Sequence, residues 1–292
     1  MPFDLGEKFR RFAYEEGANL CAFLNSKKIA ASNFILDLQN LPASLSYLEK
    51  TLEKRRDIRK WHPTSKSVMI CAWQYWNGKM KYPESLGGAR NVNSFFARNS
   101  RKPPRDCLMD YLRKRNISFK IARYAFCHDY HKTIRRKLEK VLGRIQETCL
   151  NAKGKIFVDT SPVAEKVIGL LAGLGWLGKN GLLINKKLGS YFLIGGISLN
   201  LDISGFAEEY ENLCADCNLC LEHCPTKALK GDGRVSFEKC LSYWTTQAKE
   251  KIPLEIKSKS GGWLYGCDIC QEVCPYNKNL DATLDPELMP KF

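Results

Sequence analysis

The sequence predicts a mixed α/β (α+β) domain followed by a smaller domain that is organised by cysteines. Helix-like and strand-like segments alternate through residues 1–205, whereas eight of the thirteen cysteines lie between Cys214 and Cys274. The net charge changes sign at the same point, from 36 Lys and Arg against 17 Asp and Glu in residues 1–205 to 10 against 14 in residues 206–292. We therefore expect two domains, 1–205 and 206–292, in a chain long enough to bury a sizeable core.

Hydrophobic periodicity predicts the elements of the first domain. Leu5, Phe9, Phe12 and Leu20 recur at helical spacing near the start of the chain. A longer helix is indicated between residues 134 and 149, where apolar residues form one stripe. Buried strands are expected at four apolar runs, residues 68–72, 117–122, 156–158 and 191–199.

The cysteines of the second domain follow the spacing of iron–sulfur proteins. The first block reads Cys-x2-Cys-x2-Cys-x3-Cys-Pro from Cys214 to Pro225, and the second reads Cys-x2-Cys-x3-Cys-Pro from Cys267 to Pro275. The first spacing is that of bacterial two-cluster ferredoxins, in which the fourth cysteine crosses to the other cluster. The second block lacks one cysteine, which Cys240 can supply. We therefore predict a ferredoxin-like domain with two 4Fe-4S clusters, one held by Cys214, Cys217, Cys220 and Cys274, the other by Cys224, Cys240, Cys267 and Cys270.

Zinc and disulfide bonds explain these cysteines less well. Zinc takes four ligands per ion and gives no reason for the Cys-Pro ending of both blocks. Disulfides need an oxidising compartment, and the first residues do not read as an export signal because charged residues interrupt the apolar region. No apolar run approaches the length of a membrane span. The expected location is the cytoplasm.

The basic first domain is the expected face for a polyanion. Its excess of 36 basic over 17 acidic residues contrasts with an acidic second domain. Basic clusters lie at residues 54–60, 98–105, 113–120 and 135–140, with aromatic residues among them, as in surfaces that grip phosphates and stack bases. The alternative is an ordinary solvated basic surface.

The glycine-rich run GLGWLGKNG at residues 173–181 matches two nucleotide motifs imperfectly. A dinucleotide fingerprint should follow a strand and open a helix, whereas here helical character over residues 162–171 comes first and a strand-like run at 182–184 comes after. A phosphate loop needs Ser or Thr after Lys179, and this chain has Asn180. The glycines still imply a tight turn that brings the backbone close to another part of the protein.

Asp159 directly follows the strand at residues 156–158 and has two possible roles. It could cap the helix that follows, since Asp, Thr and Ser are the usual capping residues. It could instead be an acid at the end of a strand, where ligands of open α/β sheets bind. If a large apolar cofactor covered it, desolvation would raise its pKa and let it donate a proton near neutral pH.

With these motifs in hand, the chain resembles the epoxyqueuosine reductases, which complete queuosine in the anticodon loop of certain tRNAs. The resemblance runs along nearly all of the sequence. Its motifs are KSVMI at 66–70, IARYA at 121–125, DYH at 129–131, VDTSP at 158–162, AGLGWLGKN at 172–180, CLSY at 240–243 and the two cysteine blocks.

The resemblance implies a cobalamin-binding first domain related to reductive dehalogenases, with the two clusters passing electrons to cobalt. It implies tRNA as substrate, an external electron donor and a monomer. By motif position Asp159 would be the proton donor, and the cobalamin would be lined by Arg123, His131, Asp159, Lys179, Asn180 and Ser242. No lower ligand to cobalt is expected from His131, because Ile134 replaces the glycine of the Asp-x-His-x-x-Gly motif that supplies such a ligand elsewhere.

The chain departs from the family pattern at three places. Gly181 stands where the family usually has Thr, and Gln247 stands where it usually has Glu. The C-terminal helical repeat of many members is missing from this sequence, which resembles a short form. Two other functions stay open, namely reduction of a small molecule such as an organohalide by the same cofactors, and a ferredoxin-type electron carrier.

Overall fold

The computed structural model describes residues 4–30, 41–78, 119–127, 129–203 and 210–289. Its centre is a four-stranded sheet with the order β1-β2-β7-β4, in which every neighbouring pair is antiparallel. The strands are β1 (Leu20–Asn25), β2 (Ser67–Gln74), β7 (Phe192–Leu199) and β4 (Gly154–Phe157). Three of the four runs expected as strands therefore form this sheet. Leu20, which the helical spacing had included, instead begins β1 and pairs with Ala72 of β2, because α1 ends at Glu15.

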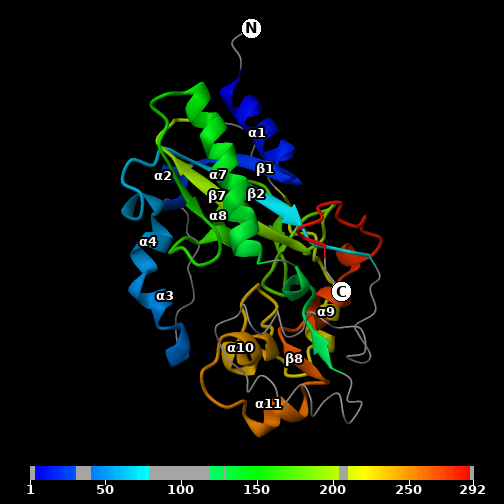
Figure 1. Ribbon diagram of the computed structural model, residues 1–292. Helices are drawn as coiled ribbons and strands as arrows, with labels where there is room; N and C mark the ends of the chain where they lie inside the picture. Colours follow the sequence, from blue (N-terminus) through cyan, green and yellow to red (C-terminus); the bar gives the residue numbers. More distant parts are fainter. Residues whose placement is uncertain (1–3, 31–40, 79–118, 128, 204–209, 290–292) are drawn as a thin grey trace.

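Helices cover both faces of the sheet because its side chains alternate between two apolar clusters. On one face, α1 (Leu5–Glu15) and α7 (Tyr130–Thr148) pack on Phe23, Met69 and Ile197, as Figure 1 shows for α7 crossing the sheet. On the other face, α2 (Ser26–Ala30) and α8 (Glu165–Leu171) border the cluster that contains Ile70 and Phe157. The result is a three-layer α/β domain.

The first turn of α7 carries Tyr130 and His131, which contribute to the candidate site described below. Asp129 is its N-cap and accepts a hydrogen bond from the Lys132 backbone N–H. The helix lies so close to the sheet that a Cβ on Gly195 of β7 would stand 2.8 Å from Ile134 Cγ2. Ile134, Leu138, Val141 and Ile145 form its fully buried stripe.

The fourth expected strand pairs elsewhere. Within the run 117–122, the structure has β3 at Lys120–Ile121, which pairs in parallel with β8 (Trp263–Tyr265) of the second domain. The central sheet, with the order β1-β2-β7-β4, does not include it. The two parts of the chain thus share a small sheet.

The second domain is made of short elements below the central sheet in Figure 1. Its C-terminal segment returns to the first domain, where Thr283 donates its N–H to the Trp76 carbonyl and Asp285 forms an ion pair with Lys137 at 3.0 Å. The elements are α9 (Leu219–His223), η5 (Phe237–Lys239), α10 (Leu241–Thr246), α11 (Leu254–Ser258), α12 (Ile269–Glu272) and η6 (Pro275–Asn277).

Short elements make up the rest of the described part of the first domain. A two-stranded hairpin, β5 (Trp176–Leu177) and β6 (Leu183–Ile184), follows α8. The remaining helices among the described residues are η1 (Ala43–Leu45), α3 (Tyr47–Lys50), α4 (Leu52–Arg56), η2 (Ile58–Lys60) and η4 (Arg123–Phe126). In the described part of the chain, no helix is long and apolar enough to cross a membrane.

Candidate cluster-binding and active sites

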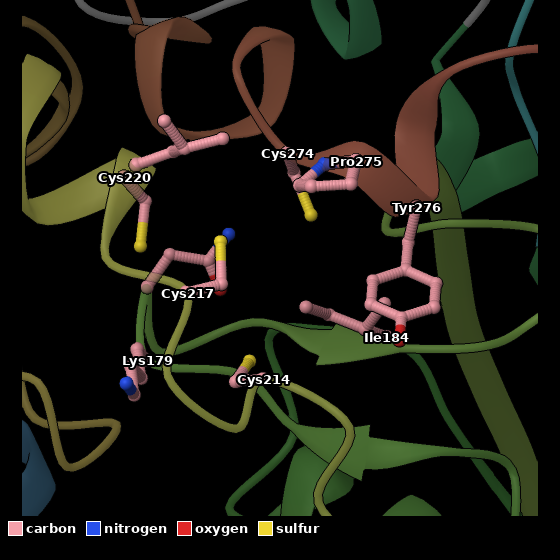
Figure 2. A pocket seen from close by; sticks show the side chains of 10 residues that line it. Lys179, Ile184, Cys214, Cys217, Cys220, Cys274, Pro275 and Tyr276 are labelled. Carbon is pink, nitrogen blue, oxygen red and sulfur yellow. The ribbon is translucent and has the colours of Figure 1, made fainter.

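The cysteines expected to hold the first cluster gather around one pocket. A space of about 330 Å³, which is partly open to solvent, is lined by Cys214, Cys217, Cys220 and Cys274. Figure 2 shows their sulfur atoms directed towards this common space, with Ile184 and Tyr276 on its far side. Cys274 comes from the second cysteine block, as the expected crossing of ligands requires.

The other four cysteines influence one another electrostatically. Burial raises the pKa of the Cys267 thiol to about 12, and charges on Cys240 and Cys224 add to the effect. Burial also raises the pKa of Cys270, with contributions from Cys267 and Cys240. A backbone N–H, that of Ala228, donates to Cys224 Sγ at 3.3 Å, as is common for cluster ligands.

One feature favours a cluster in this pocket. Trp176 packs with Cys214 and Cys274, and within the described residues its buried indole N–H has no hydrogen-bond acceptor, a role that cluster sulfur can fill. In the same part of the chain, no group of three or more His, Cys, Asp or Glu side chains is placed so that it could hold a single metal ion.

The glycine-rich run forms a wall of this pocket. It lies after α8 and contains β5, an order that does not match a dinucleotide fingerprint. Gly181 has φ +75°, and a Cβ there would stand 2.9 Å from the Gly233 carbonyl oxygen of the second domain. The tight turn expected from the glycines therefore brings the backbone against the cluster domain.

Two residues expected to line cobalamin lie in this wall. Lys179 Nζ donates to the Ala215 carbonyl at 2.7 Å and to Asn218 Oδ1 at 2.9 Å. Asn180 is buried and directs its side-chain NH₂ to the Cys270 carbonyl at 3.5 Å. Both residues thus contact the cysteine segments.

Asp159 is contacted by several polar side chains, which form a second candidate site. It has φ +51°, in the left-handed region that few residues other than glycine adopt. Its Oδ2 accepts hydrogen bonds from His131 Nε2 at 2.8 Å and from the Tyr130 hydroxyl at 3.0 Å. Its backbone N–H donates to Glu165 Oε1 at 2.5 Å. Asp159 does not cap α8, whose N-cap is Ala164.

The protein neighbours of Asp159 lower its pKa, whereas the rise considered from sequence depends on an apolar cofactor covering the carboxyl group and stays a prediction. The hydrogen bond from His131 holds the Asp159 pKa below its ordinary value, and the carboxylate side chain is 57% exposed. Burial acts to lower the pKa of His131, but the hydrogen bond and charge of Asp159 outweigh it, so the His131 pKa is raised. In this pair the proton therefore resides on the imidazole.

Glu165 and Arg55 complete the group, and sequence reasoning missed both of them together with Tyr130. Burial raises the pKa of Glu165 to about 8, and the charge of Asp159 adds to the shift. Arg55 of α4 favours the ionised form of both carboxyl groups and donates to the Val163 carbonyl at 3.0 Å. The VDTSP and DYH motifs were the only sequence signals for this site. Arg55 and Glu165 gave no signal, because the contacts join segments that are far apart in the sequence.

The two remaining candidates for cobalamin contacts lie at the border of the two domains. Arg123 is 7% exposed, its guanidinium lies 4.7 Å from the centre of the Trp76 ring, and its backbone N–H donates to Asp268 Oδ2 at 2.7 Å. Ser242 lies in the first turn of α10, two residues after Cys240.

The basic residues of α7 are engaged with acidic residues of the protein itself. Arg136 pairs with Glu287, Lys140 with Glu16 at 3.2 Å, and Lys137 with Asp285. This cluster therefore holds α1 and the C-terminal segment to α7. The clusters at residues 98–105 and 113–118 lie outside the described residues.

Comparisons with known proteins agree with these two sites. Residues 55–160 match the family described as epoxyqueuosine reductase QueG, DUF1730, and residues 213–277 match a 4Fe-4S double cluster binding domain. Epoxyqueuosine reductase of Leadbetterella byssophila is 33% identical over 94% of this chain and 80% of its own length, and that of Cyclobacterium marinum is 34% identical over 82% and 67%.

The chain belongs to the epoxyqueuosine reductase family. The resemblance stated from the motifs is thereby confirmed, as is a domain that binds two 4Fe-4S clusters. The individual ligands and site residues stay predictions.

Solved structures support the same fold. The epoxyqueuosine reductase of Streptococcus thermophilus superposes with a TM-score of 0.72 at 27% identity, covering 98% of this chain and 69% of that one. An epoxyqueuosine reductase solved with a tRNA-Tyr epoxyqueuosine-modified stem loop gives 0.76 at 27% identity, over 99% and 69%. The reductive dehalogenase NpRdhA gives 0.50 at 16% identity over 95% and 32%, which confirms the expected likeness of fold.

Proposed function

We propose that this protein reduces epoxyqueuosine to queuosine in the anticodon loop of tRNA. The observation that carries the proposal is the carboxylate–imidazole pair of Asp159 and His131, which lies in a family domain packed against a 4Fe-4S double-cluster domain. A relative at 27% identity was solved with an epoxyqueuosine-modified stem loop, which supports tRNA as the substrate.

The reaction needs both electrons and protons. Opening an epoxide to an alkene consumes two electrons and two protons and releases the oxygen as water. The clusters, held by the two sets of four cysteines, accept electrons one at a time from an external donor. Cobalamin, when bound to the first domain, supplies the reducing centre for the substrate.

His131 fits a cofactor that receives no ligand from the protein. Its Nε2 donates to Asp159, and its Nδ1 lies 3.4 Å from Asp129 Oδ1. Both imidazole nitrogens face carboxylates, so neither is directed to a metal. This arrangement supports the expectation that His131 does not ligate cobalt.

The same residues supply one of the two protons, and solvent supplies the other. His131 holds the first proton at Nε2, and Asp159, which accepts that hydrogen bond, passes it to the departing oxygen. Tyr130 keeps the carboxylate in place by a second hydrogen bond to Oδ2, and Glu165 fixes the backbone N–H of Asp159. Arg55 adds a positive charge near the oxygen as negative charge develops there.

The proposal is tested with anaerobically reconstituted protein, cobalamin, a strong reductant and an epoxyqueuosine-containing anticodon stem-loop. We expect about eight irons per chain, four for each cluster, and formation of queuosine by a monomer. Turnover of an organohalide but not of the stem-loop would favour the small-molecule reductase. Clusters without any bound corrinoid would favour the electron carrier.

A further inference from the structure

Lys179 joins the first domain to the segment 214–220, which carries three of the expected cluster ligands. Its ammonium donates to the Ala215 carbonyl and to Asn218 Oδ1, which flank Cys217 in the chain. Figure 2 shows Lys179 at the edge of the pocket, beside Cys214 and Cys217. A single side chain thus binds the backbone and a side chain of the loop 214–218.

Local hydrogen bonds fix the position of the Lys179 backbone. The turn before β6 is closed by the Gly181 N–H bond to the Gly178 carbonyl, at 2.9 Å. Asn180 is buried, and its Oδ1 accepts the Leu182 N–H at 3.2 Å. Because Gly181 packs against Gly233, this turn cannot move away from the second domain without opening the contact between them.

The charge of Lys179 is unusual for its surroundings. Among the ten described residues that line the pocket, Lys179 is the only one with a cationic side chain, and four are cysteines that bind iron as thiolates. A cluster with four thiolate ligands is negative, and it becomes more negative when it gains an electron. A nearby cation therefore favours the reduced state, and net charge, hydrogen bonds and solvent exposure are the factors that set cluster potentials.

We propose that Lys179 is a positioning residue for the cluster held by Cys214, Cys217, Cys220 and Cys274, and that it raises the reduction potential of this cluster. It holds the ligand loop closed and supplies positive charge at the rim. The inference rests on the clusters of the proposed function and does not depend on the substrate. The electron-transfer step forms and breaks no bond, because the cluster takes one electron from a donor such as dithionite.

The test is a redox titration of anaerobically reconstituted protein with dithionite, followed by electron paramagnetic resonance. We expect Lys179→Met to shift the midpoint potential of one cluster to a more negative value and to leave the other unchanged. The affected cluster should be the one whose signal Cys217→Ser alters. Lys186→Met, which removes an exposed lysine from the turn after β6, is the matched control and should shift neither potential.

Two further variants separate charge from loss of a contact. Lys179→Arg keeps the charge and should restore a potential close to that of the unaltered protein. Asn218→Ala removes one acceptor and no charge, so its shift should be much smaller than that of Lys179→Met. Equal potentials in Lys179→Met and unaltered protein, with both clusters present, would overturn this inference alone. Absence of four-iron signals from the unaltered protein would overturn the cluster assignment and the inference with it.

Discussion

The cysteine pocket and the Asp159 site differ in how sequence relates to geometry. Three cysteines expected to bind the first cluster follow one another at fixed spacing in the loop before α9 and within α9. The fourth, Cys274, lies between α12 and η6. The partners of Asp159 come from α7, α8 and α4 and share no spacing with one another. Metal ligands that lie close in sequence reveal themselves as a motif, whereas a proton site assembled by packing does not.

The largest expected effect is the loss of the cluster from the cysteine pocket. Cys274→Ala should remove the cluster expected to be held with Cys214, Cys217 and Cys220, although those three belong to the other cysteine block. Iron analysis should fall by about four atoms per chain, and the spectrum of the second cluster should persist. Cys149→Ala, outside both sets, is the matched control and should retain all iron. Loss of the cluster with Cys267 and Cys270 instead would refute the crossing.

The next effect concerns the chemistry at Asp159. Asn tolerates the left-handed conformation that Asp159 adopts, so Asp159→Asn should fold normally. It removes the proton-transferring carboxylate, which is typically worth ~10²–10⁴-fold in rate. Queuosine formation should fall by about that factor, while iron and cobalamin content and binding of the stem-loop are retained. A rate close to that of unaltered protein would exclude Asp159 from proton transfer.

A smaller effect, with a distinct pH dependence, is expected at His131. Its pKa is raised, so the proton-bearing form is complete below its ordinary pKa and is lost as pH rises through the raised value. Activity should therefore decline on the alkaline side of the pH–rate profile, and we call this decline the alkaline limb. His131→Gln keeps a donor to Asp159 but cannot titrate, so the limb should disappear and the rate at neutral pH should fall by about tenfold or more.

Two controls sharpen this measurement. Tyr130→Phe removes the other hydrogen bond to Asp159 Oδ2 and should lower the rate slightly while keeping the limb. Glu165, with its pKa raised to about 8, can add a pH dependence of its own, so Glu165→Gln separates its contribution. An unchanged alkaline limb in His131→Gln would show that the imidazole is not the source of the proton.

The sequence by itself determined the class of fold, the family and the cluster domain. The strands β2, β4 and β7 and the helix α7 were predicted because burial of one stripe or of alternate side chains leaves a local pattern. The cysteine sets were predicted because cluster ligands recur at short fixed spacing. Asp159 was recognised through the VDTSP motif, although its role as a cap was equally open.

Only the tertiary structure decided which side chains meet. It paired β3 with β8 across the two domains, directed Lys179 and Asn180 to the cysteine segments, and brought His131 to Asp159. It also showed that the protein neighbours of Asp159 lower its pKa, because His131 donates a hydrogen bond to the carboxylate. Contacts between distant segments depend on how helices and strands pack, and no local pattern of residues records them.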